Sequence, residues 1–160
     1  MQEKVVTRAV LAARLPMLRD DGATIVFTNG CFDLMHIGHT RYLQAAKALG
    51  DVLIVGVNSD ESVRSLNKAP DRPIVPEAQR AEVVAALGCV DYAVIFPEPD
   101  PLALITLVQP DVLVKGGDWP LDRIVGREVV QARGGKVLTI PLVPGFSTTA
   151  LIHRIRTTSA

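Results

Sequence analysis

Five short and almost continuously apolar segments, separated by stretches with helical periodicity, constrain the fold of this chain more than any other feature. They are Thr24–Thr28, Val52–Val57, Tyr92–Phe96, Val112–Lys115 and Val137–Ile140. Strands that are apolar throughout, rather than at alternate positions, are typical of a parallel sheet that is covered on both faces. Right-handed crossovers then predict a Rossmann-like, doubly wound α/β domain with five parallel strands and helices on both faces. In such a sheet, ligands bind beyond the carboxyl ends of the strands.

Helical periodicity fills the connections between these segments. The predicted helices cover residues 4–19, a stretch that begins at Gly38 and is closed by Gly50, Asp60–Leu66, Glu77–Leu87, Leu102–Val108, Asp122–Arg133, and a last helix that starts near Ser147. A length of 160 residues, without an internal repeat or a linker-like segment, predicts one domain over residues 1–160. Residues 1–22 are expected to form an N-terminal helical extension of this domain.

Charge and composition exclude several classes of protein. Lysine plus arginine equals aspartate plus glutamate at 17 each, so the chain offers no electrostatic footprint for nucleic acid or an anionic membrane. No apolar run approaches the roughly 18 residues of a membrane span, and the N-terminus lacks the apolar core of a signal peptide. Cys31 and Cys89 are isolated in the sequence, which is typical of reduced thiols. We therefore expect a cytoplasmic protein that binds neither nucleic acid nor membrane.

The loop after the first strand carries the strongest chemical signal. It reads Gly30-Cys31-Phe32-Asp33-Leu34-Met35-His36-Ile37-Gly38-His39. Gly38 begins a helix whose free amide groups favour anions, and His36 and His39 lie on the same side of that helix start. Near their ordinary pKa of about 6.5, two imidazoles can donate hydrogen bonds to a phosphate there. Solvated helix-start residues are the structural alternative, and a metal site is the functional one, but His153 lies too far along the chain to be a third ligand.

A Gly-Gly turn follows the fourth strand, in Lys115-Gly116-Gly117-Asp118. Glycines let the backbone lie against a planar base or a ribose. Lys115 can pair with phosphate, and Asp118 can accept a hydrogen bond from a ribose or sugar hydroxyl. An ordinary turn has the same composition, so this motif alone leaves both interpretations open.

A third motif, Gly145-Phe146-Ser147-Thr148-Thr149, stands just before the last helix. Ser147 is a good N-cap residue for that helix. The hydroxyl groups of Ser147, Thr148 and Thr149, together with the free amide groups, can also hold phosphate oxygens.

Basic residues accompany a Pro-rich loop at residues 67–76. Lys68 and Arg72 lie within the loop, and Arg80 lies in the helix that follows it. Isolated basic residues are usually solvated, but a loop of this kind is also well placed to close over an anionic substrate and to supply positive charge.

These motifs together resemble the nucleotidylyltransferase superfamily, whose members carry a His-x-Gly-His signature after the first strand. The resemblance extends from Ile25 to about Ile155. It rests on Gly30 to Asp33, the His36 to His39 signature, Val57-Asn58-Ser59-Asp60, Arg72-Pro73-Ile74 with Pro76-Glu77, Val114 to Asp118, and Ser147-Thr148-Thr149. Within the superfamily, the chain is most similar to D-glycero-β-D-manno-heptose 1-phosphate adenylyltransferases in their separate form, without a fused sugar kinase. Glycerol-3-phosphate cytidylyltransferases are similar too, but they usually carry Arg-Thr where this chain has Leu142 and Val143, which favours ATP over CTP.

The resemblance implies that heptose 1-phosphate attacks the α-phosphorus of ATP in line, giving ADP-heptose and pyrophosphate. It implies catalytic roles for His36, His39 and Lys68. It also implies a nucleotide site made of Cys31, Phe32, Asp33, Gly38, Arg80, Lys115, Gly116, Gly117, Asp118, Gly145, Phe146, Ser147 and Thr148. Mg²⁺ is expected to accompany ATP and to be held mainly by its phosphates, and a homodimer is expected. Asp33 has an alternative role, the orientation of its own loop.

Two other functions stay open at this point. One is cytidylyl or guanylyl transfer to another phosphorylated polyol or sugar, such as glycerol 3-phosphate. The other is a nucleotide-binding module without catalysis. A fragment of a class I aminoacyl-tRNA synthetase shares the His-Ile-Gly-His letters, but the length and the neutral charge of this chain disfavour it.

Overall fold

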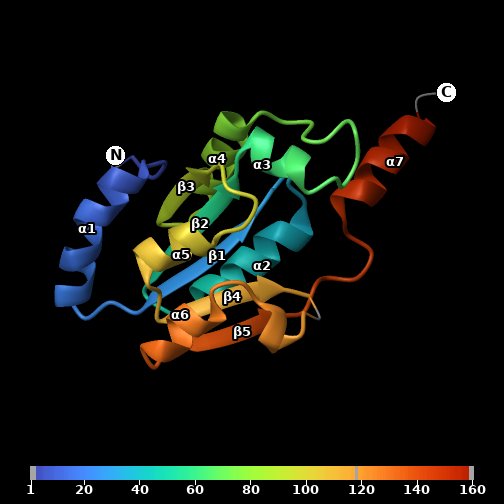
Figure 1. Cartoon of the computed structure of the whole chain (residues 1–160). Coiled ribbons are helices and arrows are strands. Elements are labelled where there is room, and N and C mark those ends of the chain that lie inside the picture. Colours follow the sequence, from blue (N-terminus) through green and yellow to red (C-terminus); the bar gives the residue numbers. More distant parts are fainter. Residues whose placement is uncertain (1–2, 118, 159–160) are drawn as a thin grey trace.

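A computed structural model describes residues 3–117 and 119–158 of the chain (Figure 1). Its five strands are β1 (Ile25–Gly30), β2 (Val52–Asn58), β3 (Tyr92–Phe96), β4 (Val112–Gly116) and β5 (Lys136–Ile140). They form one parallel sheet in the order β3-β2-β1-β4-β5. The predicted Rossmann-like α/β fold with five parallel strands is therefore confirmed. The order reverses direction between β1 and β4, which makes their carboxyl ends the topological switch point where ligands bind in this fold.

The helices cover both faces of the sheet. They are α1 (Arg8–Asp20), α2 (Ile37–Lys47), α3 (Asp60–Ser65), α4 (Glu77–Ala86), α5 (Leu102–Val108), the 3₁₀ turn η1 (Leu121–Arg123), α6 (Arg127–Ala132) and α7 (Thr148–Thr158). One apolar core joins α1, α5 and α6 to one face of the sheet, and a second core joins α2 and α4 to the other face. Side chains at successive strand positions point to opposite faces, so that Phe27 belongs to the first core and Val26 to the second.

The N-terminal segment is built into the domain differently from the predicted helix over residues 4–19. Residues 4–6 run beside β3 instead, where Ala93 donates to the Lys4 carbonyl and Val6 donates to the Ala93 carbonyl. The helix begins after Thr7, whose hydroxyl accepts from the amide of Val10 as an N-cap. The apolar side of α1, at Leu11 and Leu15, is buried in the first core and is therefore covered by the chain itself.

The predicted helix over Asp122–Arg133 is also wrong as a single element. The structure has the short η1 turn and then α6, and Gly126 separates them with a left-handed φ of 86°. A Cβ on Gly126 would lie 2.6 Å from Cδ1 of Ile105, so glycine permits both the backbone turn and the close packing on α5. Helical periodicity continues through this break, which is why the sequence pattern hides it.

No helix among the described residues is both long enough and apolar enough to cross a membrane. The last helix, α7, extends from the body of the domain beyond the loop over residues 67–76 (Figure 1). None of the described residues of α7 is fully buried.

Candidate active site

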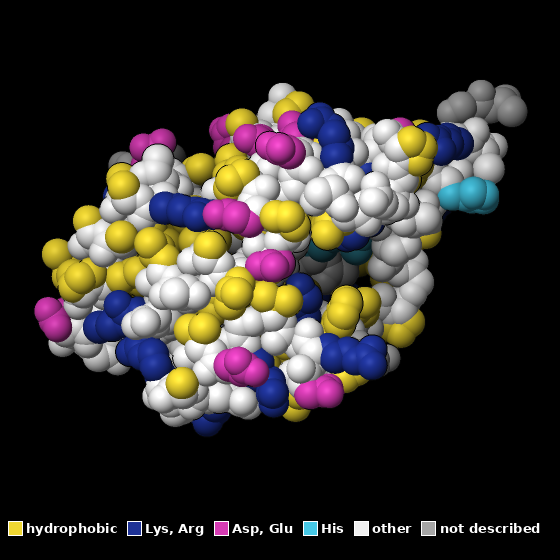
Figure 2. Space-filling model, in the orientation of Figure 1, with side chains coloured by type: hydrophobic (Ala, Val, Ile, Leu, Met, Phe, Trp, Pro, Cys, Tyr) yellow, Lys and Arg dark blue, Asp and Glu magenta, His cyan; other side chains and the backbone are white. Residues whose placement is uncertain are grey.

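A cavity of about 430 Å³ lies beyond the carboxyl ends of β1 and β4, at the predicted ligand site of the sheet. Figure 2 shows the molecular surface hollowed next to α7, with lysine or arginine side chains at the edge of the hollow. The cavity brings together segments that are far apart in the sequence. Its lining includes Cys31, Phe32, Asp33, His36, Gly38, His39, Lys68, Arg72, Lys115, Gly116, Phe146, Ser147, Thr148 and Thr149. Most of the predicted site residues therefore share one cavity.

The two histidines are held by hydrogen bonds at the start of α2. His36 is the N-cap residue, and its Nδ1 accepts from the amide of Gly38 at 3.1 Å. Nδ1 of His39 accepts from the amide of His36 at 3.3 Å. In a neutral imidazole, an accepting Nδ1 leaves the proton on Nε2. Both histidines are thus fixed as Nε2–H donors, and their ring centroids lie 3.9 Å apart.

Gly38 is required by this arrangement. A Cβ at this position would lie 2.8 Å from Cε1 and 2.9 Å from Nδ1 of His36. Any side chain there would displace the imidazole that caps the helix. Gly38 therefore serves the site through the room it leaves for His36.

Burial keeps both imidazoles neutral in the unliganded protein. The pKa of His39 is lowered to about 4, first by burial and then by unfavourable electrostatic interactions with His36, Arg72 and Lys68. The pKa of His36 is also lowered by burial. The sequence suggested donors near their ordinary pKa, whereas the structure has neutral imidazoles that each offer one N–H.

Asp33 lies under the loop over residues 67–76, which we call the basic flap. Its side chain is completely buried. Burial alone would raise the pKa of Asp33, but the amide groups of Ile74 and Val75 and the guanidinium group of Arg72 together hold that pKa below its ordinary value. The carboxylate is therefore charged and occupied by donors from the basic flap.

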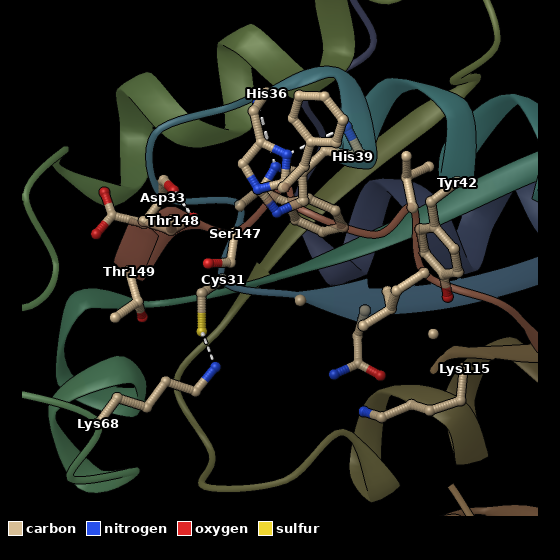
Figure 3. A pocket seen from close by; sticks show the side chains of 18 of the residues that line it. Cys31, Asp33, His36, His39, Tyr42, Lys68, Lys115, Ser147, Thr148 and Thr149 are labelled. Carbon is tan, nitrogen blue, oxygen red and sulfur yellow. Dashed lines mark hydrogen bonds between the residues drawn. The ribbon is translucent and has the colours of Figure 1, made fainter. Parts of the chain in front are cut away.

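Lys68 reaches the cavity from the same flap, with its Nζ 3.7 Å from Sγ of Cys31 (Figure 3). Arg80 does not reach it. Its side chain is 1% exposed and donates to the carbonyls of Val75 and Cys31 and to the carboxylate of Asp60. Arg80 thus supports the flap and the β1 loop from beneath, in place of the phosphate contact that the resemblance implied.

The start of α7 forms another wall of the cavity. Ser147 caps the helix as predicted, since its hydroxyl accepts from the amide of Ala150 at 3.0 Å. The Thr148 hydroxyl donates to the backbone carbonyl of Asp33 at 2.7 Å. Figure 3 shows Ser147, Thr148 and Thr149 across the cavity from Lys115, with the two histidines between them along one edge.

The end of β4 supplies the remaining wall. Lys115 and Gly116 line the cavity, while Gly117 and Gly145 lie outside its lining, and Asp118 lies outside the described residues. A Cβ on Gly116 would lie 3.2 Å from Leu142 and 3.4 Å from Tyr42, so a flat apolar surface borders the backbone here. Burial lowers the pKa of Lys115, and the positive charge of Lys68 lowers it further.

Asn29 and Tyr42 line the cavity although the sequence motifs give neither a role there. Asn29 is a polar residue at the carboxyl end of an apolar strand, which is a usable signal. Tyr42 follows the helical pattern of a core residue, and its hydroxyl bonds to Thr28 and to the Val114 carbonyl, so nothing in the pattern marks it as a cavity residue.

The described residues contain no group of three or more His, Cys, Asp or Glu side chains that could hold a metal ion. The carboxylate nearest the histidines in sequence, Asp33, is occupied by the flap.

Similar sequences are found among curated bacterial proteins. Over 156 residues the chain is 53% identical to the Bifunctional protein HldE of Geotalea uraniireducens, covering 98% of this chain and 32% of that protein. It is 55% identical over 134 residues to the HldE of Geobacter metallireducens, covering 84% of this chain and 27% of that protein. The chain thus spans about a third of the length of these relatives.

Solved structures with the same fold are also found. The lipopolysaccharide core biosynthesis protein from Thermoplasma volcanium superimposes with a TM-score of 0.62 at 30% identity, covering 76% of this chain and 98% of that chain. Pantothenate synthetase from Thermus thermophilus shares the fold, with a TM-score of 0.58 at 18% identity, covering 88% of this chain and 62% of that chain. Residues 27–157 match the family described as Cytidylyltransferase-like, and they contain the whole cavity lining. This chain belongs to the cytidylyltransferase-like family of nucleotidylyltransferases.

Proposed function

We propose that this protein transfers the adenylyl group of ATP to D-glycero-β-D-manno-heptose 1-phosphate. An oxygen of the sugar phosphate attacks the α-phosphorus, the bond from that phosphorus to the bridging oxygen breaks, and pyrophosphate leaves with the bonding electrons. The products are ADP-heptose and pyrophosphate. One observation carries the proposal: two imidazole donors at the start of α2 and two hydroxyl groups at the start of α7 line the same cavity.

The proposed role of the histidines follows from their fixed tautomers. Phosphoryl transfer needs alignment of two anions and stabilisation of charge on the phosphoryl oxygens. Nε2–H groups of His36 and His39, held in place before the substrate arrives, can donate to the α-phosphoryl oxygens without reorganisation. A bound phosphate would also favour protonation of His39, whose pKa is low in the unliganded protein.

The start of α7 is proposed to hold the β- and γ-phosphates. Its free amide groups and the Ser147 hydroxyl, which accepts from Ala150 and still has its proton to donate, are suitable partners for phosphate oxygens. The Thr148 hydroxyl donates to the Asp33 carbonyl in this structure, so it can donate to a phosphate oxygen only by giving up that bond. Lys68 lies between this wall and the β1 loop, where its charge can act on the leaving pyrophosphate. Mg²⁺ entering with ATP would bridge phosphate oxygens in the same region.

The apolar surface beside Gly116 is the proposed site for the adenine base. Leu142 and Tyr42 border Gly116 in this part of the cavity. Leu142 and Val143 occupy the positions where similar cytidylyltransferases usually carry Arg-Thr, and both line the cavity. An apolar wall here supports a preference for adenine over cytosine.

The sugar phosphate is proposed to bind at Lys115, on the side of the cavity that lies across from the start of α7. A second recess of about 80 Å³ adjoins the main cavity and shares Asn29, Lys115 and Trp119 with it. This position places the acceptor across the cavity from Ser147 and Thr148, as in-line displacement of pyrophosphate requires. Heptose is proposed as the sugar because of the similarity to HldE and to a lipopolysaccharide core biosynthesis protein.

Pyrophosphate release tests the proposal. ATP, CTP and GTP are each combined with β- and α-anomers of heptose 1-phosphate and with glycerol 3-phosphate. We expect rapid release only for ATP with the β-anomer. Faster release with another pair would reassign the substrates, and ATP binding without release from any pair would favour a nucleotide-binding module.

A further inference from the structure

The histidine loop, the basic flap and the start of α7 all contact one residue, Asp33. Asp33 stands three positions before His36, on the loop that positions both histidines. Its carboxylate accepts from the basic flap, and its backbone carbonyl accepts from Thr148 at the start of α7. We propose that Asp33 is a positioning residue that clamps the basic flap to the histidine loop and thereby places the Lys68 ammonium group.

Both carboxylate oxygens of Asp33 accept hydrogen bonds from the basic flap. Oδ2 accepts from Nε of Arg72 at 2.7 Å and from the amide of Ile74 at 2.9 Å, and Oδ1 accepts from the amide of Val75 at 2.9 Å. The side chain of Asp33 is 0% exposed and that of Arg72 is 8% exposed. A carboxylate with three donors in a buried position holds its partners far more rigidly than an exposed ion pair does.

The backbone beside Asp33 is bent to bring this carboxylate inward. Phe32 and Leu34, the residues on either side, have φ values of 51° and 53°. Left-handed backbone is uncommon for residues other than glycine and persists where surrounding contacts enforce it. The contacts with the basic flap and with Thr148 are among those that hold this turn.

The clamp is proposed to act on catalysis through the position of Lys68. It lies four residues before Arg72 on the same flap, and the contact of its ammonium group with Cys31 is the one hydrogen bond described for it. Without the clamp, the flap would be free to carry the ammonium group away from the cavity. A displacement of about 1 Å in a catalytic group can cost on the order of 100-fold in rate.

A double-mutant cycle with Lys68 tests this role, which rests on the proposed function. Asp33→Asn is expected to lower kcat/KM for ATP by about 10- to 100-fold. In a Lys68→Met background, the same change should cost less than about twofold, because the group that Asp33 places is already gone. Asp71→Asn is the matched control: it is the same change on the same flap, in an exposed ion pair with Arg156, and should cost less than about twofold.

Limited trypsin digestion provides a readout that needs no acceptor sugar. Trypsin does not cut Arg72 because Pro73 follows it, so cleavage after Lys68 reports on the flap. Asp33→Asn should speed cleavage after Lys68 by about tenfold, and Asp71→Asn should leave it nearly unchanged. If the wild-type protein releases no pyrophosphate with any acceptor, the proposed function fails while this measurement and ATP affinity still decide the clamp.

Several results would overturn the clamp. One is an additive loss from Asp33→Asn in the Lys68→Met background. Another is unchanged cleavage after Lys68. A third is a shift in the Mg²⁺ concentration for half-maximal activity with normal cleavage, which would make Asp33 a metal ligand. If Asp33→Asn does not fold, Arg72→Gln removes one of the three donors to the carboxylate. It is expected to lower kcat/KM less than Asp33→Asn does, and this loss too should shrink below about twofold in the Lys68→Met background.

Discussion

Two helix starts line the same cavity, and they are supported in very different ways. The start of α2 is anchored by a helix whose Tyr42, Leu43 and Ala46 are buried in the second core. Its two histidines are fixed by hydrogen bonds within the same turn. The start of α7 belongs to a helix without a fully buried residue among those described. Side-chain links from α7 to the rest of the domain include Thr148 to the Asp33 carbonyl and Arg156 to Asp71.

This difference suggests a division of labour between the two starts. A helix packed into the core offers donors that are positioned before the substrate binds, which is what stabilisation of a transition state requires. A helix held by a few polar contacts can adjust to its ligand and is suited to binding phosphates that must later leave as pyrophosphate. Changes at α2 should therefore act mainly on kcat, and changes at α7 mainly on KM for ATP.

The largest expected effect is at α2. His39→Ala should lower kcat by roughly 10²–10³-fold, which is the usual loss for one preorganised donor, while KM for ATP changes little. Steady-state pyrophosphate release with ATP and the sugar phosphate measures both constants. His153→Ala, an exposed histidine of α7, is the matched control and should behave like the wild type. Unchanged turnover in His39→Ala would remove the catalytic role from α2.

At α7, Thr148→Val should raise KM for ATP by about tenfold or more, with kcat within a few-fold of wild type, because a hydrogen bond to a charged group is lost. The variant keeps the shape of threonine but also loses the bond to the Asp33 carbonyl. Thr148→Ser restores the hydroxyl group and should recover most of the affinity. A loss confined to kcat would contradict the assignment of this helix start to binding.

Sequence reasoning foresaw the sheet well because its strands are apolar throughout. The bounds of β3 and α5 are those expected from the sequence pattern. It failed where a long-range contact decides the outcome. Whether Arg80 reaches substrate or lies beneath the flap depends on acceptors at Cys31, Asp60 and Val75 that only the folded chain assembles.

The site motifs behaved in the same way. The pairing of His36 with His39 follows from helix geometry, so their shared location could be predicted. Their low pKa could not, because burial and the approach of Lys68 and Arg72 are tertiary features. The occupation of Asp33 by the basic flap likewise depends on a segment about forty residues away.

A smaller effect is expected from pH on the stability of the fold, through His39 at the start of α2. Burial lowers the pKa of His39 from its ordinary 6.5 to about 4. Between these two pH values, His39 is protonated in the unfolded chain and neutral in the folded protein. The contribution of His39 to the free energy of unfolding therefore falls as the pH drops through this window, and it is constant above the window. The lowered pKa of Asp33 stabilises the fold fully above its ordinary value of 3.8, and this stabilisation is lost only as the pH falls below that value. Asp33 therefore adds no slope within the window of His39.

Thermal unfolding over this pH window measures the contribution of His39. The Tm of the wild-type protein should fall as the pH drops from about 7 to about 4.5, and His39→Gln should show a shallower fall because it has no proton to bind. His36, whose pKa is also lowered, retains part of the slope in this variant. Parallel curves for the two proteins would contradict the neutral, buried state assigned to His39.

The smallest expected effect is at the outer end of α7. Arg156 pairs with Asp71 of the basic flap, but its side chain is 66% exposed, and exposed ion pairs contribute about 0–1 kcal/mol. Arg156→Gln should therefore change the free energy of unfolding by less than about 1 kcal/mol and KM for ATP by less than about twofold. Urea unfolding and initial rates measure these quantities. If Arg156→Gln instead raises KM as much as Thr148→Val does, the orientation of α7 is set along its whole length, and its start is as firmly positioned as that of α2.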